Sequence, residues 1–139
     1  MARRKFHRII FILAGCYNLA WGLYSSLYPQ WLFEFSGMPP LNHPEIFTCL
    51  AMVVGIYGFL YLEVARVPEK GRAIAAVGLL GKVLGPIGAI YLIAVGTWPA
   101  KSFVLCLTND LIWWIPFSLY LYDSYRYHKS GVLLSRAEG

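Results

Sequence analysis

The chain has 139 residues, of which 58% are hydrophobic and only 14% are charged. Globular domains in water carry about a quarter charged residues, so this composition argues against a soluble domain. A net charge of +5 would suit a nucleic-acid ligand, but the basic residues gather in short clusters at the ends of apolar segments. The length and this pattern predict a single membrane domain with no nucleic-acid partner.

Four apolar segments are each long enough to cross a bilayer, which takes about 20 residues in a helix. These segments have no polar face of the kind that a helix in water needs. The predicted spans are residues 9–28, 46–64, 73–97 and 102–122. Because the second and third connections are short, the sequence predicts an all-α, polytopic membrane protein, a compact four-helix up-down bundle.

The first span has two features of an export signal. Residues 3–6 (Arg-Arg-Lys-Phe) resemble a twin-arginine signal, and residues 13–16 (Leu-Ala-Gly-Cys) resemble the cleavage box of lipoproteins. However, the apolar region before Cys16 is short for a signal, and the hydrophobic stretch continues to Leu27. We therefore expect an uncleaved signal anchor.

The basic residues alternate between the two sides of the predicted membrane. Clusters at 3–8, 66–72 and 126–136 flank the spans on one side, whereas the other two connections carry a single basic residue, Lys101. By the positive-inside rule both termini and the second connection are cytoplasmic, which predicts a multi-pass protein of the inner membrane. The outer loop 29–45 contains several aromatic residues and is predicted to lie at the lipid–water interface. Residues 126–139 are predicted to form a loose polar tail in the cytoplasm.

Glycines are spaced as in helices that pack closely in lipid. The third span contains Gly78, Gly81, Gly85 and Gly88, and the second contains Gly55 and Gly58. Such spacing lets two helix backbones approach closely, so we expect these residues to mark helix contacts.

Each span also carries a polar residue near the middle of the membrane. At about 1.5 Å per residue, Asn18, Tyr57, Lys82 and Asp110 fall at similar depths, and Asn109 adjoins Asp110. Isolated charges are costly there, so Lys82 and Asp110 are predicted to pair. Because helical side chains lean toward their own N-terminus, Asn18, Tyr57 or a water is expected to bridge the two charges.

Two interpretations of this polar cluster stay open. It is either an ion pair that sets helix register, or the polar floor of a ligand cavity or proton relay. Trp113 and Trp114 lie one turn from Asp110 and favour a cavity, because an indole offers a flat apolar wall and an N–H donor. A lipophilic head group such as a quinone or sterol would suit it. The candidate ligand-binding residues are Asn18, Trp21, Tyr57, Lys82, Asn109, Asp110, Trp113 and Trp114.

Other reactive residues give weaker predictions. Cys49 and Cys106 fall at a similar outer depth, so a thiol pair is geometrically conceivable, although membrane cysteines are usually apolar fillers. His7, His43 and His128 lie at span ends on opposite sides, which argues against an intramembrane haem or metal site. We predict no catalytic residues.

Four segments carry a family resemblance: residues 15–22 (GCYNLAWG), 52–58 (MVVGIYG), 81–88 (GKVLGPIG) and 109–117 (NDLIWWIPF). Together they resemble a DoxX-like family of small bacterial four-helix membrane proteins, over about residues 8–123. Some members carry the label alkyl hydroperoxide reductase. The resemblance implies the four-helix fold and an association with redox or oxidative-stress systems.

Three functional hypotheses follow. The first is a non-catalytic subunit or binding protein that holds a quinone- or lipid-like ligand and assists a membrane redox or lipid-linked complex. Its partners would be membrane lipids and either a larger complex or a second copy of the chain. The second is an oligomeric transporter or proton-coupled channel in which Lys82 and Asp110 titrate. The third is a thiol redox enzyme that uses Cys49 and Cys106.

Overall fold

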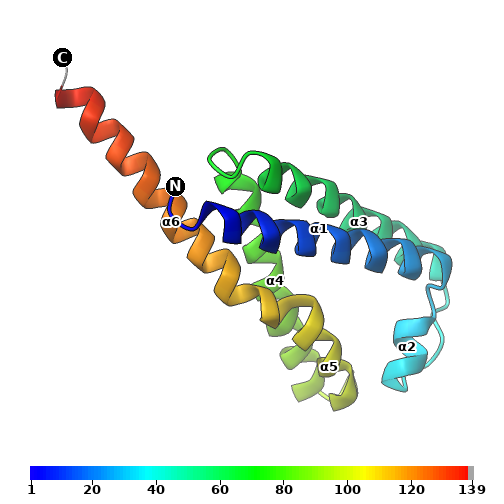
Figure 1. The fold of residues 1–139 in the computed structure, drawn as a ribbon. Coiled ribbons are helices and arrows are strands. Elements are labelled where there is room, and N and C mark those ends of the chain that lie inside the picture. The colour runs from blue at the N-terminus through cyan, green and yellow to red at the C-terminus, as the bar shows by residue number, and fades with distance from the viewer. Residues whose placement is uncertain (138–139) are drawn as a thin grey trace.

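The computed structural model describes the backbone of residues 1–137 and the side chains of residues 1–130. All regular structure in the described residues is helical (Figure 1). In chain order the elements are α1 (Arg4–Leu27), α2 (Trp31–Ser36), α3 (Pro44–Arg66), α4 (Arg72–Ala94), the 3-10 turn η1 (Ala100–Ser102), α5 (Phe103–Cys106), the π-helical turn η2 (Leu107–Leu111) and α6 (Ile112–Ala137).

Four of the helical segments are long and apolar enough to cross a membrane. They are Arg4–Leu27, Pro44–Arg66, Arg72–Ala94 and Ala100–Ser130, which confirms the predicted number of spans. Large apolar side chains face outward along them, among them Leu23 (65% exposed), Ile56 (58%) and Ile115 (80%). A surface of this kind is stable against lipid chains and costly against water, as expected for a multi-pass membrane protein.

Local sequence signals account for the helix ends that bound these spans. Pro44 occupies the first turn of α3, where its missing N–H costs no hydrogen bond. At the end of α4, Gly96 adopts a left-handed conformation with φ of 76°. Its N–H bonds to the carbonyl of Ile93, and the next N–H, from Thr97, bonds to Leu92 at 2.9 Å. This Schellman motif ends α4 at Ala94, three residues before the predicted end of the span.

The four long helices form two pairs. α1 lies beside α3, and α4 packs against α6, with the second pair crossing the first at a steep angle (Figure 1). The pairs meet near the connection between α3 and α4 and diverge toward their other ends. The four apolar helices are compatible with the predicted four-helix bundle, and spans two and three and spans three and four are in contact; the most extensive helix contact, however, is between the first and second spans.

The predicted outer loop contains the short helix α2, which lies where the two pairs diverge (Figure 1). Phe33 of α2 packs edge-to-face on Phe47 of α3, with ring centroids 5.4 Å apart. The Phe35 ring lies 4.6 Å from the Lys101 ammonium of η1. α2 therefore connects the two helix pairs at their diverging ends.

Glycines make the contact between α1 and α3 possible. A Cβ atom added to Gly22 would lie 2.4 Å from the Cα of Gly55, and one added to Gly15 would lie 2.9 Å from the carbonyl oxygen of Gly58. Any side chain at these positions would push the two backbones apart. The sequence predicted the α3 half of this contact, Gly55 and Gly58, but not its α1 partners.

The glycine stripe on α4 packs differently from the prediction. Gly78 contacts the Tyr61 ring, and Gly85 contacts the side chain of Asp110. Gly81 and Gly88, by contrast, have no atom within 4 Å of an added Cβ. For these two residues the predicted helix contact is wrong, because they face open space beside α4 instead of a neighbouring backbone.

An aromatic cluster joins the two pairs where they meet. Phe11 of α1 packs against Phe117 and Tyr120 of α6, at centroid distances of 4.6 and 4.8 Å. Tyr61 of α3 packs edge-to-face on Phe117 at 5.2 Å. The Tyr120 hydroxyl donates a 2.6 Å hydrogen bond to the carbonyl of Pro68 in the connecting loop. The aromatic cluster and this hydrogen bond hold the two helix pairs together at the end where they meet.

α6 continues beyond the bundle. Its backbone is helical to Ala137, and its last turns project away from the other helices (Figure 1). The predicted loose tail is therefore wrong for residues 126–137, and residues 138–139 lie outside the described residues. No proline follows Pro116 in the sequence, so the residue that most strongly breaks a helix is absent where the apolar span ends.

Candidate functional site

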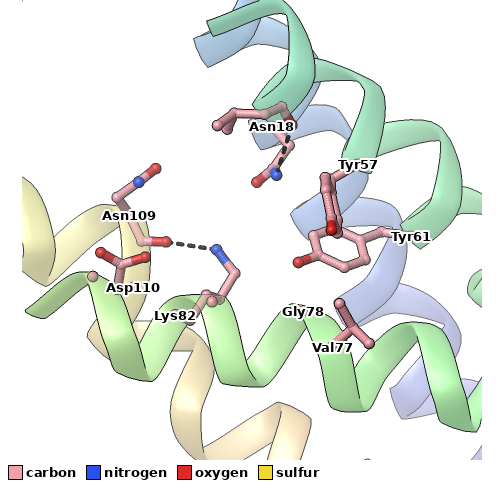
Figure 2. A pocket seen from close by; sticks show the side chains of 11 residues that line it. Asn18, Tyr57, Tyr61, Val77, Gly78, Lys82, Asn109 and Asp110 are labelled. Atoms are coloured by element: carbon pink, nitrogen blue, oxygen red, sulfur yellow. Dashed lines mark hydrogen bonds between the residues drawn. The ribbon is translucent and has the colours of Figure 1, made fainter. Parts of the chain in front are cut away.

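A cavity of about 340 Å³ lies between the helix pairs at the level of the polar cluster. Each of the four spans contributes to its wall, and most of the wall is apolar. Figure 2 shows the polar side chains around it. The lining residues are Asn18 of α1, Val54, Tyr57 and Tyr61 of α3, Val77, Gly78, Gly81, Lys82 and Gly85 of α4, and Asn109 and Asp110 of η2.

Lys82 lines this cavity and is 6% exposed. Its ammonium donates a 2.7 Å hydrogen bond to the backbone carbonyl of Asn109 (Figure 2). Asn109 belongs to the π-helical turn Leu107–Leu111, where the backbone departs from regular α-helical hydrogen bonding. The Lys82 ammonium is therefore hydrogen-bonded to a backbone carbonyl and not to a carboxylate.

The predicted ion pair between Lys82 and Asp110 is absent from the described residues. Both side chains line the same cavity, so the prediction that they share a site agrees with the geometry, whereas direct pairing is wrong. The opposite lean of side chains on the two helices, together with the carbonyl of Asn109, explains why they do not meet.

Asp110 is 9% exposed, and no described residue donates a hydrogen bond to its carboxylate. The carboxylate rests against α4 at Gly85, where an added Cβ would lie 3.1 Å from Oδ2. Glycine at position 85 thus makes room for the acid. A buried acid without a donor is costly in a membrane protein, and such residues are typically functional.

The opposite wall of the cavity comes from α1 and α3. The Asn18 side chain donates a 3.1 Å hydrogen bond to the carbonyl of Val54, which leaves its amide oxygen available. The Tyr57 and Tyr61 rings follow along α3, 6.3 Å apart and inclined at 60° (Figure 2). Tyr61 packs against Gly78 of α4, so a glycine again makes room for a large side chain.

The three candidate tryptophans have different positions. Trp21 packs on Phe47 at 6.4 Å and does not line the cavity. Trp113 is buried beside Lys82, whose ammonium lies 5.7 Å from its ring centroid. Trp114 donates its indole N–H to the backbone carbonyl of Lys82 at 2.9 Å. Trp113 and Trp114 therefore contact Lys82 at its ammonium and at its backbone carbonyl, and neither lines the cavity.

The cysteines and the possible metal ligands were the other reactive residues considered from the sequence. Cys16, Cys49 and Cys106 are all free. Within the described part of the chain, no three histidine, cysteine or acidic side chains gather as a metal site would require. The cavity is thus the main candidate for a functional site.

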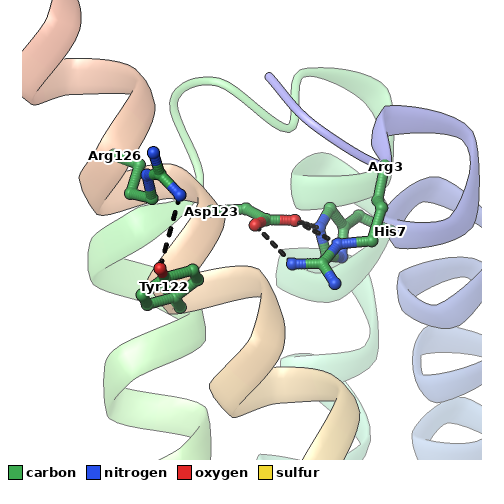
Figure 3. A network of polar contacts seen from close by, with 5 residues as sticks. All are labelled: Arg3, His7, Tyr122, Asp123 and Arg126. Atoms are coloured by element: carbon green, nitrogen blue, oxygen red, sulfur yellow. Dashed lines mark hydrogen bonds and ion pairs between the residues drawn. The ribbon is translucent and has the colours of Figure 1, made fainter.

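A second polar cluster, which the sequence did not predict, joins the start of α1 to α6 (Figure 3). Asp123 accepts hydrogen bonds from Arg3 at 2.8 and 2.6 Å and lies 2.8 Å from Nε2 of His7. The side chains of Asp123 and His7 are 3% and 0% exposed. The available signal was an acid at position 123, directly after the predicted fourth span and just before the basic cluster that begins at Arg126.

A related contact lies nearby. Arg4 donates a 2.7 Å hydrogen bond to Glu69 in the loop between α3 and α4, and this bond lowers the pKa of the Glu69 carboxyl. Together with the Asp123 cluster it ties the N-terminal residues to α6 and to the loop between α3 and α4. Comparisons with models of protein families, with curated proteins and with solved structures give no match to this chain.

Proposed function

We propose that this protein is a non-catalytic binding protein of the inner membrane that holds a lipophilic molecule in the cavity between its helix pairs. The main support is the Asp110 carboxylate, which is buried at the cavity without a hydrogen-bond donor. A volume of about 340 Å³ lies within the range of small-molecule sites, which are mostly apolar with a few polar groups. A quinone- or lipid-like molecule fits this volume and the mostly apolar wall.

The route into the cavity supports a membrane-dissolved ligand. Gly81 and Gly85 line the cavity and are exposed on the surface of α4, among outward-facing apolar residues such as Leu84. A ligand can thus enter sideways from the lipid, with its tail left among the acyl chains. In this proposal the protein presents its ligand to a partner complex, in line with the redox association that the DoxX-like resemblance implies.

Filling the cavity should remove the ligand. Gly81→Leu places a side chain in open space at the cavity wall, so we expect a folded protein whose ligand occupancy falls at least about tenfold. Gly88→Leu is the matched control, because Gly88 also has open space beside it but does not line the cavity. Native mass spectrometry of gently extracted protein measures the occupancy.

Two outcomes of this experiment would contradict the proposal. One is a wild-type protein that carries no lipophile in stoichiometric amount. The other is an equal occupancy in Gly81→Leu and Gly88→Leu, which would place the bound molecule elsewhere on the surface.

We further propose that both termini face the cytoplasm, as the distribution of basic residues favours. In a variant without the three native cysteines, a cysteine at Lys101 should react with a membrane-impermeant maleimide added to intact cells. A cysteine at Lys70, which is also exposed, should react only after lysis. The reverse labelling pattern would invert the topology.

A further inference from the structure

The two charged side chains that line the cavity have opposite hydrogen-bonding roles. Asp110, as a carboxylate, can only accept hydrogen bonds. Lys82 can only donate, and one of its three N–H groups is taken by the carbonyl of Asn109. Both residues line the same cavity. A ligand that satisfies both must carry a hydrogen-bond donor and an acceptor in one small head group.

The charges limit the head group further. Lys82 and Asp110 carry opposite formal charges, and no other charged residue lines the cavity. An anionic head would be attracted to the Lys82 ammonium but repelled by the Asp110 carboxylate, and a cationic head would be attracted to Asp110 but repelled by Lys82. In a poorly solvated site the repulsion offsets much of the attraction, so a single charge is poorly matched. The site therefore suits a head without net charge.

The remaining walls indicate the shape of that head. Tyr57 and Tyr61 present two aromatic rings, and Val54 and Val77 add apolar surface. Aromatic walls favour flat rings, which stack or pack edge-to-face against them. A hydroxyl on such a ring provides both a donor for Asp110 and an acceptor for Lys82, because its O–H donates and its oxygen accepts.

We infer that the cavity binds a neutral, ring-headed lipophile of the phenol class, with the ring hydroxyl donating to Asp110 and its oxygen accepting from Lys82. This inference rests on the proposed binding function and specifies its ligand. The alkyl part leaves the cavity at Gly81 and Gly85. An ether in place of the hydroxyl removes the donor, and a carboxylate in its place brings a negative charge next to Asp110.

Three probes of nearly equal size test this inference: para-octylphenol, para-octylanisole and para-octylbenzoate. Binding to the purified wild-type protein in a mild detergent is measured by isothermal titration calorimetry. We expect the phenol to bind at least about tenfold more tightly than either of the others. Equal affinities for the phenol and the anisole would overturn the inference, and this comparison needs no variant.

Asp110→Asn then tests the role of the acid. The amide keeps the shape of the side chain but can also donate a hydrogen bond, so the preference for the phenol over the anisole should fall to about twofold or less. A preference that is unchanged in a folded variant would exclude Asp110 as the acceptor. Native mass spectrometry of the Gly81→Leu variant distinguishes a failure of this inference from a failure of the proposed binding function. If Gly81→Leu loses a native lipophile but no phenol preference exists, the inference fails and the proposed function stands.

Discussion

Gly22→Ala is expected to cause the largest loss of stability of any single methyl group added to this chain. The new Cβ would lie 2.4 Å from the Cα of Gly55 and 2.8 Å from the carbonyl oxygen of Ala51. Both are backbone atoms, so no side-chain rotation can relieve the overlap. α1 must move away from α3, and close backbone contact is a main source of helix association in lipid. We expect a loss of about 3 kcal/mol in the free energy of unfolding.

The measurement is unfolding by SDS in mixed micelles, followed by circular dichroism. Gly88→Ala is the matched control, because it adds the same methyl group at a helical position where the new Cβ has no neighbouring atom within 4 Å. Its stability should equal that of the wild type or exceed it slightly, since alanine is the better helix former. Equal stability of Gly22→Ala and Gly88→Ala would show that the contact between α1 and α3 is not as close as described.

Asp123→Ala is expected to have the second largest effect on stability. Removal of the carboxylate leaves Nε2 of His7 without a partner, and Nδ1 of that fully buried side chain already has none. It also releases Arg3, whose side chain is 46% exposed and can recover water. Losing one partner of a buried polar group costs several kcal/mol when the other cannot be solvated, and here we expect about 2 kcal/mol.

The same unfolding assay measures this loss, and Asp123→Asn refines it. The amide oxygen can still accept one hydrogen bond, so this variant should lie between the alanine variant and the wild type. Glu63→Ala is the control for removal of an acid, because Glu63 forms an exposed ion pair with Arg66 on the same helix, and such pairs add little stability. An Asp123→Ala variant no less stable than Glu63→Ala would contradict the role of the buried cluster.

The residues of the cavity show how far depth along a helix can be predicted. Asn18, Tyr57, Lys82 and Asp110 were expected at one level of the membrane, and all four line the same cavity. Depth follows from counting residues along a helix of known rise, which requires no tertiary information. Trp21 was expected at the cavity and instead packs on Phe47, because its direction depends on how α1 is rotated about its axis.

The sequence by itself determined the helical class of this protein and the number and approximate positions of its apolar spans, since hydropathy and length add up along the chain without reference to packing. The tertiary structure decided which faces of the helices meet. In the structure α1 packs on α3 through Gly22 and Gly55, whereas Gly81 faces open space at the cavity. The Lys82 ammonium donates its hydrogen bond to the carbonyl of Asn109. Rotation about a helix axis and a local π-helical turn are set by contacts between residues distant in sequence, and no local pattern in one sequence encodes them.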